Sequence, residues 1–388
     1  MNLTQWQEEL REILPEVIRL RRDFHQHPEL SGCEERTQKV IMGLLEGMGM
    51  EVRTFRDCCG VMGILRNGEG RCVAIRADMD ALPVEEPEWL PFASEIPGCM
   101  HACGHDVHMA LALGSAMWLS RHRDQWHGTV KWFFEPAEET FGGGRLMVEQ
   151  GCLEAPRVDC VIGQHVNPRY EAGTIFSKPG YVSGSSDELR LTVRGKSCHG
   201  AYPEAGVDAI VIAGQVVSAL QTLVSRTLSP FEPAVVTIGI IQGGTANNIV
   251  CNEVRMVGTL RTLSADARGT MKQRIRDVVT GVARAMGGDA EVQINPGYGA
   301  VYNHDAYYAR VEDLAAELVG RDRIVRRDQA SLGVESFCYF LKDTPGVYYD
   351  LGCGVSTALH TPTFMVDEDC LLPGVALQCA AVMKLLED

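Results

Sequence analysis

The sequence lacks a long apolar run and an excess of basic residues, and we expect no export signal. Its N-terminal stretch MNLTQWQEELREILPEVIRL is acidic and amphipathic, whereas a signal peptide has a continuous apolar core. No apolar run approaches the roughly 18 residues needed to span a bilayer. The net charge of −15 argues against a nucleic-acid partner, because binding a phosphate backbone requires clustered Lys and Arg. We therefore expect a cytoplasmic chain with no membrane or nucleic-acid partner.

The 14 cysteines include no CxxC pair, and their spacing is irregular. A CxxC pair is the usual sign of a thiol redox protein, so that class is disfavoured. Since we expect no export signal, a disulfide framework is not expected either. We expect most of these cysteines to be small buried apolar residues.

A chain of 388 residues is long for one compact domain, so we expect two domains or one domain with a large insertion. The apolar runs 73–75 and 130–134 predict strands, and 110–119 predicts a helix. The apolar residues between 10 and 18 have helical spacing, with Pro15 either kinking that helix or starting a second one. Strands that alternate with helices predict an α/β sheet covered on both faces.

The middle of the chain predicts a second, smaller domain. Its pattern runs strand, helix, strand, strand, helix, strand, which is the split βαβ layout. The predicted elements are 188–194, 207–224, 234–241, 253–261, 265–286 and 290–294. We therefore expect a ferredoxin-like (βαββαβ) domain at residues 185–296, inserted into a mixed-sheet α/β domain formed by residues 1–184 and 297–388.

Candidate metal ligands gather after predicted strands. Asp78 and Asp80 follow the run 73–75, and the segment 100–108 holds three histidines, a cysteine and an aspartate. Within that segment, Cys103 and His105 are close enough in sequence to reach one metal centre. A thiolate and an imidazole are good ligands for zinc and its neighbours. A solvated loop that holds these residues by chance is the alternative.

Two adjacent carboxylates, Glu138 and Glu139, follow the predicted strand 130–134 and a proline. The position after a buried strand is where α/β sheets place their sites. One carboxylate could bind metal while its neighbour acts as a general base. Adjacent acids are otherwise typical of a solvated surface. His165 and His360 are further candidates, although a single histidine is more often structural than a ligand.

Eight stretches along nearly the whole chain carry a family resemblance. They are RRDFHQHPELS (21–31), AIRADMDALPVEE (74–86), MHACGHDVHMA (100–110), FFEPAEE (133–139), GQHV (163–166), GGTANNIV (243–250), GTLRT (258–262) and LHTPTF (359–364). With them the sequence resembles the M20 metallopeptidase superfamily, in the branch of aminoacylases, hippurate hydrolases and indole-acetyl-amino-acid hydrolases. Many matches in order are more specific than one short motif.

The resemblance implies a role for each matching residue in the larger, catalytic domain. Glu138 would be the general base, and Asp80 would orient a ligand histidine without binding metal itself. Asp78 stands where other branches keep a ligand histidine, so it is not assigned as a ligand. Two divalent metal ions per subunit (Zn, Mn, Co or Ni) are implied, with Cys103 as the expected bridging ligand. The implied ligands are Cys103, His105, Glu139, His165 and His360.

The inserted domain would be the lid and dimerisation module of the family, so a homodimer is expected. By the resemblance, His199 would reach the active site of the partner subunit and hold the developing oxyanion, with Asn248 in a similar role. Arg261 would bind the free carboxylate of the substrate. That positive charge would offset the acidic chain, whose field repels anions.

The implied reaction is hydrolysis of the amide bond of small N-acyl amino acids (acetyl, benzoyl or aryl-acyl) to a carboxylic acid and an amino acid. The stretch at 333–337 departs from the branch, because Ser336 replaces an acid, and this leaves the substrate preference open. One alternative is a metallo-exopeptidase or dipeptidase on the same scaffold. Another is a non-catalytic metal- or amino-acid-binding protein, which Glu138 disfavours because storage needs no base.

Overall fold

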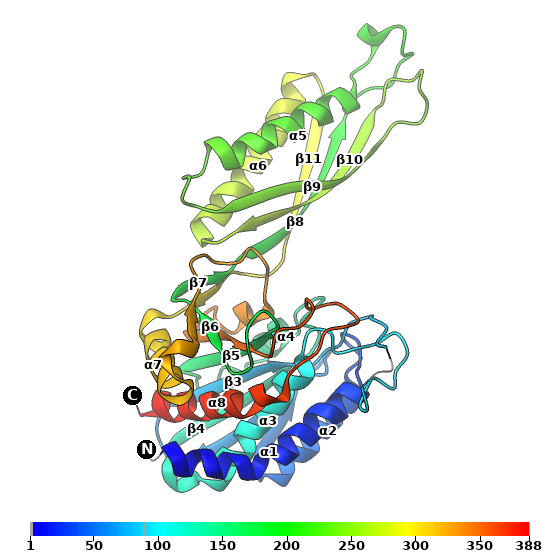
Figure 1. Cartoon of the computed structure of the whole chain (residues 1–388). Helices are drawn as coiled ribbons and strands as arrows, with labels where there is room; N and C mark the ends of the chain where they lie inside the picture. Colours follow the sequence, from blue (N-terminus) through cyan, green and yellow to red (C-terminus); the bar gives the residue numbers. More distant parts are fainter. Residues whose placement is uncertain (1–2, 88–89, 388) are drawn as a thin grey trace. The chain divides into compact units, whose positions relative to one another are not determined.

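The computed structural model describes residues 3–87 and 90–387, and the chain divides into two units (Figure 1). The first unit comprises Met1–Val182, Tyr302–Gln329 and Ser336–Asp388. The second comprises Ser183–Val301 and the short segment Ala330–Glu335. The segment 330–335 lies far from residues 183–301 in the sequence, and no local sequence pattern links the two.

The first unit contains helices and strands in alternation. Its helices are α1 (Leu3–Gln26), α2 (Glu35–Gly47), α3 (His105–Arg121), α4 (Gly144–Glu149), α7 (Asp305–Val319) and α8 (Leu371–Leu386). Its strands are β1 (Glu51–Thr54), β2 (Val61–Asn67), β3 (Cys72–Asp78), β4 (Gly128–Glu135), β5 (Cys160–Asn167), β6 (Ile175–Ser177), β13 (Ile324–Arg326) and β14 (Gly346–Gly352). The short strands β7 (Gly180–Ser183) and β12 (Val301–Asn303) pair where the chain passes between units.

Within the described residues, eight strands form one mixed sheet in the order β1-β2-β4-β3-β5-β14-β6-β13. The central strands β4, β3, β5 and β14 run parallel to one another, whereas β2 is antiparallel to β4. This arrangement confirms the predicted mixed α/β class. Because the central strands are parallel, their carboxyl ends meet at one edge of the sheet, which is the usual place for a site.

Both faces of this sheet are covered, as the continuous burial of β3 and β4 requires. Strand β4 shows the two faces, since its successive side chains point in opposite directions. Trp132 belongs to the core beneath α1, α3 and α8, and its Nε1 donates to Ser115 Oγ on α3 at 3.0 Å. Phe133 faces the other way and stacks on Phe340 with 5.3 Å between ring centroids. Helices α1, α3 and α8 lie side by side in Figure 1.

Two predictions about helices need correction or sharpening. Pro15 does not start a second helix, because α1 runs through it from Leu3 to Gln26. Helix α3 starts at His105, before the predicted 110, so the histidine-rich segment is not a solvated loop. Its residues from His105 to Leu119 are all buried.

The second unit has the predicted order of elements. They are β8 (Ser185–Arg194), α5 (Ala209–Arg226), β9 (Ala234–Gly243), β10 (Glu253–Thr262), α6 (Ala265–Ala285) and β11 (Asp289–Pro296). The strands form an antiparallel sheet in the order β11-β8-β10-β9. Helices α5 and α6 bury one stripe each against it, with Ile212, Val216, Met271 and Ile275 in the core. Figure 1 shows both helices on one face of this sheet.

Among the described residues, two segments are long and apolar enough to cross a membrane: Ala209–Arg226 and Glu368–Leu386. Length and composition are weak evidence for a span, because core helices pass the same test. The second segment is 72% buried within the protein, and α5 packs on the sheet of its own unit.

Candidate metal centre

The candidate site lies at the carboxyl edge of the parallel strands in the first unit. Asp78 ends β3, Glu135 ends β4, and these two residues are register partners. His165 lies near the end of β5, opposite Asp350 of β14. The topology thus collects at one edge segments that are far apart in the sequence.

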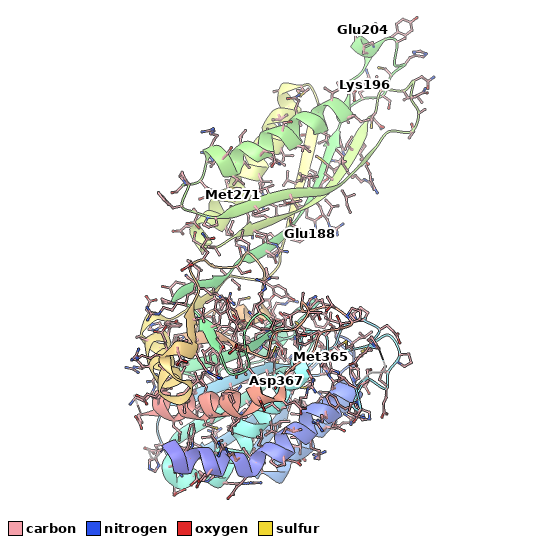
Figure 2. The ribbon with its side chains drawn as sticks, in the orientation of Figure 1. Glu188, Lys196, Glu204, Met271, Met365 and Asp367 are labelled. Atoms are coloured by element: carbon pink, nitrogen blue, oxygen red, sulfur yellow. The ribbon has the colours of Figure 1, made fainter. Side chains whose placement is uncertain are left out.

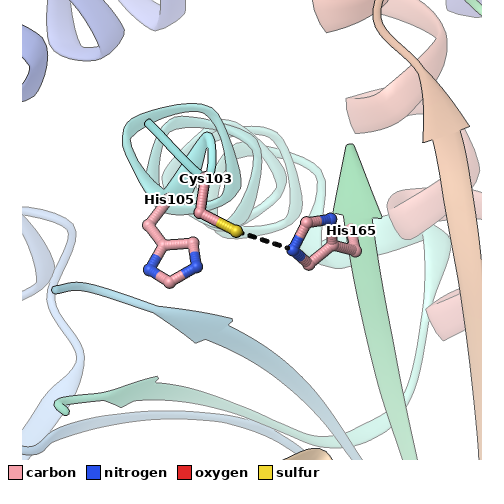
Figure 3. A group of neighbouring side chains, drawn as sticks. All are labelled: Cys103, His105 and His165. Atoms are coloured by element: carbon pink, nitrogen blue, oxygen red, sulfur yellow. Dashed lines mark hydrogen bonds between the residues drawn. The ribbon is translucent and has the colours of Figure 1, made fainter. Parts of the chain in front are cut away.

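Helix α3 starts at this edge and presents Cys103 and His105 (Figure 3). The two residues flank Gly104, whose φ of 81° is in the left-handed region. A Cβ at position 104 would lie 2.3 Å from Val166 Cγ2, so no other residue fits there. The glycine therefore permits a close approach of the α3 start to β5, which carries His165.

Backbone carbonyls fix the orientation of two of the histidines. His105 Nδ1 lies 2.8 Å from the carbonyl oxygen of Asp80, and His165 Nδ1 lies 2.7 Å from that of Val166. A carbonyl oxygen only accepts, so each Nδ1 carries a proton, and in the neutral ring each Nε2 carries the lone pair. His105 Nε2 is buried and has no hydrogen-bond partner in the described part of the chain. Both rings are oriented as metal-ligating histidines usually are.

The sulfur of Cys103 lies between the remaining candidate ligands. It is 3.5 Å from His165 Nε2 (Figure 3). It is also 3.4 Å from His360 Nε2. His360 Nε2 is in turn 3.0 Å from Glu139 Oε1. Four groups of three ligand atoms lie within 4.8 Å of one another among the described residues. Two consist only of predicted ligands and share Cys103: one with His105 and His165, the other with Glu139 and His360. The other two are Asp78 with His105 and His108, and His105 with Glu138 and Glu139.

The electrostatics of this cluster fit a cation. Burial raises the pKa of the Cys103 thiol well above its usual range, so a thiolate there needs a nearby positive charge. Burial opposes protonation of His105, yet the charge of Asp78 and the contact with Asp80 raise its pKa, so this ring would bind a cation in exchange for the proton on Nε2. Burial lowers the pKa of His165 to about 3, which keeps that ring neutral, as a ligand must be.

Asp80 organises the loop that carries the two glutamates. Its carboxylate accepts from the backbone N–H groups of Glu138 and Glu139, each at 3.0 Å, and from Ser31 Oγ at 2.6 Å. The preceding residue, Ala137, has a φ of 55°, an uncommon conformation for a residue with a side chain. Glu138 is 9% exposed, and its Oε1 accepts from the backbone N–H of Ser336 at 3.2 Å.

Asp78 and His108 also lie within 4.8 Å of His105 Nε2, but both are already engaged. His108 Nε2 accepts from the backbone N–H of Val166 at 2.9 Å, so its Nδ1 carries the proton and donates to Asp78 Oδ1 at 2.5 Å. Neither nitrogen of His108 is left for a metal. Its role is to join β3 to β5 behind the ligand cluster.

Comparison with known proteins identifies the family. Residues 74–384 match peptidase family M20/M25/M40. The chain belongs to this family. It is therefore an M20-family hydrolase, and its two-unit α/β fold agrees with that of the solved M20 structure described next.

Three relatives illustrate the range within the family. An N-acetylcysteine deacetylase of Bacillus subtilis is 38% identical over 357 residues, covering 92% of this chain and 93% of the relative. Thermostable carboxypeptidase 1 of Saccharolobus solfataricus is 34% identical over 385 residues, covering 97% of each chain. The crystal structure of a Bacillus subtilis protein, described as a dinuclear metal binding peptidase from the M20 family, has a TM-score of 0.85 and 34% identity, covering 97% of this chain and 99% of that one.

The other predicted site residues of this M20 hydrolase belong to its second unit. His199 forms an isolated bridge with Ile249, and the N–H of Gly200 donates to the carbonyl of Asn248 at 2.8 Å, so His199 and Asn248 are neighbours. Lys196 and Glu204, which bracket His199 in the sequence, lie at one end of this unit (Figure 2). Arg261 lies on β10 between Ser186 and Val235 on the adjoining strands.

One buried residue near the site, Arg76, was not singled out by the sequence, and Ser336 was singled out only as a departure from the branch. Arg76 is 1% exposed and donates to Ser336 Oγ at 2.7 Å, and Ser336 is 0% exposed. An arginine inside the apolar run of β3 was the available signal, since a buried charge requires partners. The hydroxyl of Ser336, where the sequence departs from its branch, contacts this arginine.

Proposed function

We propose that the chain hydrolyses the amide bond of N-acyl amino acids with two divalent cations. The observation that carries this proposal is the convergence of four candidate ligands around the sulfur of a fifth, Cys103, with the carboxylate of Glu138 beside them. The ligands would be Cys103, His105, Glu139, His165 and His360, with Cys103 shared between the cations. Their sulfur, nitrogen and oxygen donors suit Zn, Mn, Co or Ni. When bound, the cations supply Lewis acidity and make water acidic enough to ionise near neutral pH.

Glu138 performs the proton transfers in this proposal. Its carboxylate takes a proton from the attacking water and later delivers that proton to the departing amine nitrogen. The C–N bond breaks in the second step, which releases a carboxylic acid and a free amino acid. The backbone N–H of Ser336 donates to Oε1 of Glu138, which restrains the position of this carboxylate.

The second unit would complete the site through the residues that the family resemblance points to. The N–H of Ala201 donates to His199 Nδ1 at 3.0 Å, so a neutral His199 carries its proton on Nε2 and can donate it to an oxyanion. Asn248 would donate alongside. Arg261 would pair with the substrate carboxylate, and its Nη1 is buried with no hydrogen-bond partner among the described residues.

We also propose that the chain forms a homodimer through the second unit. Strand β9 is at the edge of its sheet, and its side chains Ile240 and Ile241 are 50% and 56% exposed. A long apolar edge strand is a template for pairing with another strand. Ile210 and Val211 of α5 are each 51% exposed in the same unit. A second copy of β9 offers the same edge in return, as a two-fold interface requires.

The proposed compartment is the cytoplasm. Every cysteine in the described residues is free, including the buried pair Cys353 and Cys370. Free thiols in this number suit a reducing compartment.

The test of the reaction is Glu138→Gln, with Glu149→Gln on the exposed side of α4 as the matched control. We expect Glu138→Gln to lower kcat by about 10²–10⁴-fold on an N-acetyl amino acid while bound metal is unchanged. The control should be fully active. Near-normal turnover by the first variant would refute the assignment of the base.

The competing proposal is a metallo-exopeptidase, which the similarity to a carboxypeptidase supports. The two differ in whether the substrate has a free α-amino group. Release of amino acids from a panel of N-acetyl, N-benzoyl and indole-acetyl amino acids, compared with dipeptides, separates them. Preferential cleavage of the dipeptides would favour the peptidase.

A further inference from the structure

Arg76 is a buried cation in the middle of β3 with three directed contacts. Its Nε donates to Glu135 Oε2 at 2.7 Å, its Nη1 to Asp78 Oδ2 at 2.6 Å and its Nη2 to Ser336 Oγ at 2.7 Å. The acceptors come from the end of β4, the end of β3 and the start of the short helix Ser336–Tyr339. These segments meet only in the folded chain, so Arg76 joins them.

The contact between Arg76 and Glu135 restrains the start of the loop formed by residues 136–143. The other oxygen of Glu135, Oε1, accepts from the backbone N–H of Gly144 at 2.7 Å. This hydrogen bond joins the two residues that flank the loop 136–143. This loop carries Glu138. A Cβ at position 144 would lie 2.5 Å from Glu135 Oε1, so glycine is required for this closure. One guanidinium thus fixes the carboxylate that in turn fixes both ends of the loop.

The contact with Ser336 reaches Glu138 from the opposite side. Ser336 is fully buried, and its hydroxyl accepts from Arg76 while its backbone N–H donates to Glu138 Oε1. The Ser336 hydroxyl therefore sets where that N–H lies. Glu138 is therefore restrained at two points, through its loop by Glu135 and at its carboxylate by Ser336. Arg76 contacts both of these residues.

We propose that Arg76 is a positioning residue that places the carboxylate of Glu138 through Ser336 and Glu135 without touching substrate. This inference rests on the function proposed above, in which Glu138 is the base. A planar guanidinium suits the task because its donors point in fixed directions, whereas the lysine ammonium is a point charge on a flexible stem. Burial of the charge is costly, and the carboxylates of Glu135 and Asp78 offset that cost.

The first test is Ser336→Ala, which removes the hydroxyl and keeps the backbone N–H. The matched control is Ser115→Ala on α3, since Ser115 is also fully buried and its hydroxyl also accepts from a buried donor, Trp132 Nε1. We expect Ser336→Ala to lower kcat about 10–100-fold with KM and metal content unchanged, as for other outer contacts of a metal site. Ser115→Ala should lower Tm about as much as Ser336→Ala does, while its kcat stays unchanged. Equal activity of the two variants would overturn the proposal.

The second test asks whether Ser336 acts through Glu138. In a Glu138→Asp background, whose shortened carboxylate no longer matches the Ser336 N–H, Ser336→Ala should cause no further loss of kcat. If Ser336→Ala lowers kcat by the same factor in the Glu138→Asp background as in the unmodified protein, Ser336 acts through another group and the proposal is wrong. Arg76→Lys should repeat the kcat loss of Ser336→Ala. If Arg76→Lys does not fold, the comparison of Ser336→Ala with Ser115→Ala still tests the proposal.

These outcomes separate the inference from the function on which it rests. An active Glu138→Gln enzyme would end the proposed function. An inactive Glu138→Gln enzyme with a fully active Ser336→Ala variant would leave that function intact and end only the positioning role of Arg76.

Discussion

Among single residues, Cys103 is the one shared by the two groups that consist only of the predicted ligands, so it would be the bridging residue of the proposed metal centre. His165 and His360 each belong to one group only. Burial keeps the thiol neutral in the absence of a cation, so its ionisation and the arrival of a cation are linked. A bridging sulfur should therefore matter to both cations.

This sharing predicts different metal contents for three variants. Cys103→Ala should weaken both sites and leave less than one cation per chain at metal concentrations that saturate the unmodified protein. His165→Ala and His360→Ala should each retain one cation. Native mass spectrometry counts the cations directly. A Cys103→Ala protein that still holds two cations tightly would show that the sulfur does not bridge.

At the scale of helices and strands, regular patterns were predictable and long-range contacts were not. The order of elements in the inserted unit followed from hydrophobic periodicity, because each element there buries one face. The start of α3 at His105 was missed, since the polar residues of its first turn gave no apolar period. The contact of Arg76 with Ser336 joins positions 260 residues apart, and only the sheet topology brings them together.

The candidate ligands were predictable for a different reason. His105 stands out in a cluster of polar residues, and Glu139 follows an apolar strand. His165 and His360 were single candidates, which the family resemblance turned into expected ligands. The engagement of His108 with Asp78 and Val166 was not predictable, because the neighbouring strand supplies the backbone donor. Sequence thus pointed to the donors, and only coordinates separate a ligand from a structural histidine.

Helices α1 and α3 are joined by a buried histidine whose protonation should be visible in stability. His25 on α1 lies 2.8 Å from Asp106 Oδ2 of α3 and 3.1 Å from Glu86 Oε1. Burial opposes its charge, but Asp106 and Glu86 outweigh burial and raise the pKa of His25. The stabilisation is therefore full below the ordinary imidazole pKa of about 6.5 and is lost as pH rises through the raised value.

This linkage predicts a pH-dependent effect of His25→Gln. The drop in Tm relative to the unmodified protein should be larger at about pH 6 than at about pH 9, because the protonated ring stabilises only the acidic side. The exposed His127→Gln serves as control and should show no such difference. Thermal unfolding followed by circular dichroism measures both. A drop that grows toward alkaline pH would contradict the charged pair.

At the scale of the whole molecule, the negative charge of the chain bears on substrate binding, and the exposed edge of β9 bears on dimerisation. A net charge of −15 repels an anionic substrate, so in the proposed site binding would depend on local positive groups such as Arg261 and the cations. If His199 serves the site of the partner subunit, dimerisation is part of catalysis. Activity should then depend on how subunits are combined.

Mixed dimers test this arrangement. Glu138→Gln and His199→Ala proteins should each be nearly inactive alone. After unfolding and refolding together, random pairing should restore about a quarter of full activity, since half of the dimers are mixed and each has one complete site. An inactive mixture whose mixed dimers are demonstrated by native mass spectrometry would place His199 in its own subunit's site or outside the reaction.

The central claim is that five side chains between positions 103 and 360 hold two divalent cations needed for hydrolysis. The most direct measurement removes all metal with a chelator and then titrates Zn or Mn back while bound metal and hydrolysis of an N-acetyl amino acid are followed together. The account predicts no turnover in the stripped protein and full turnover as the second cation binds. Full turnover by protein shown to contain no metal would contradict it.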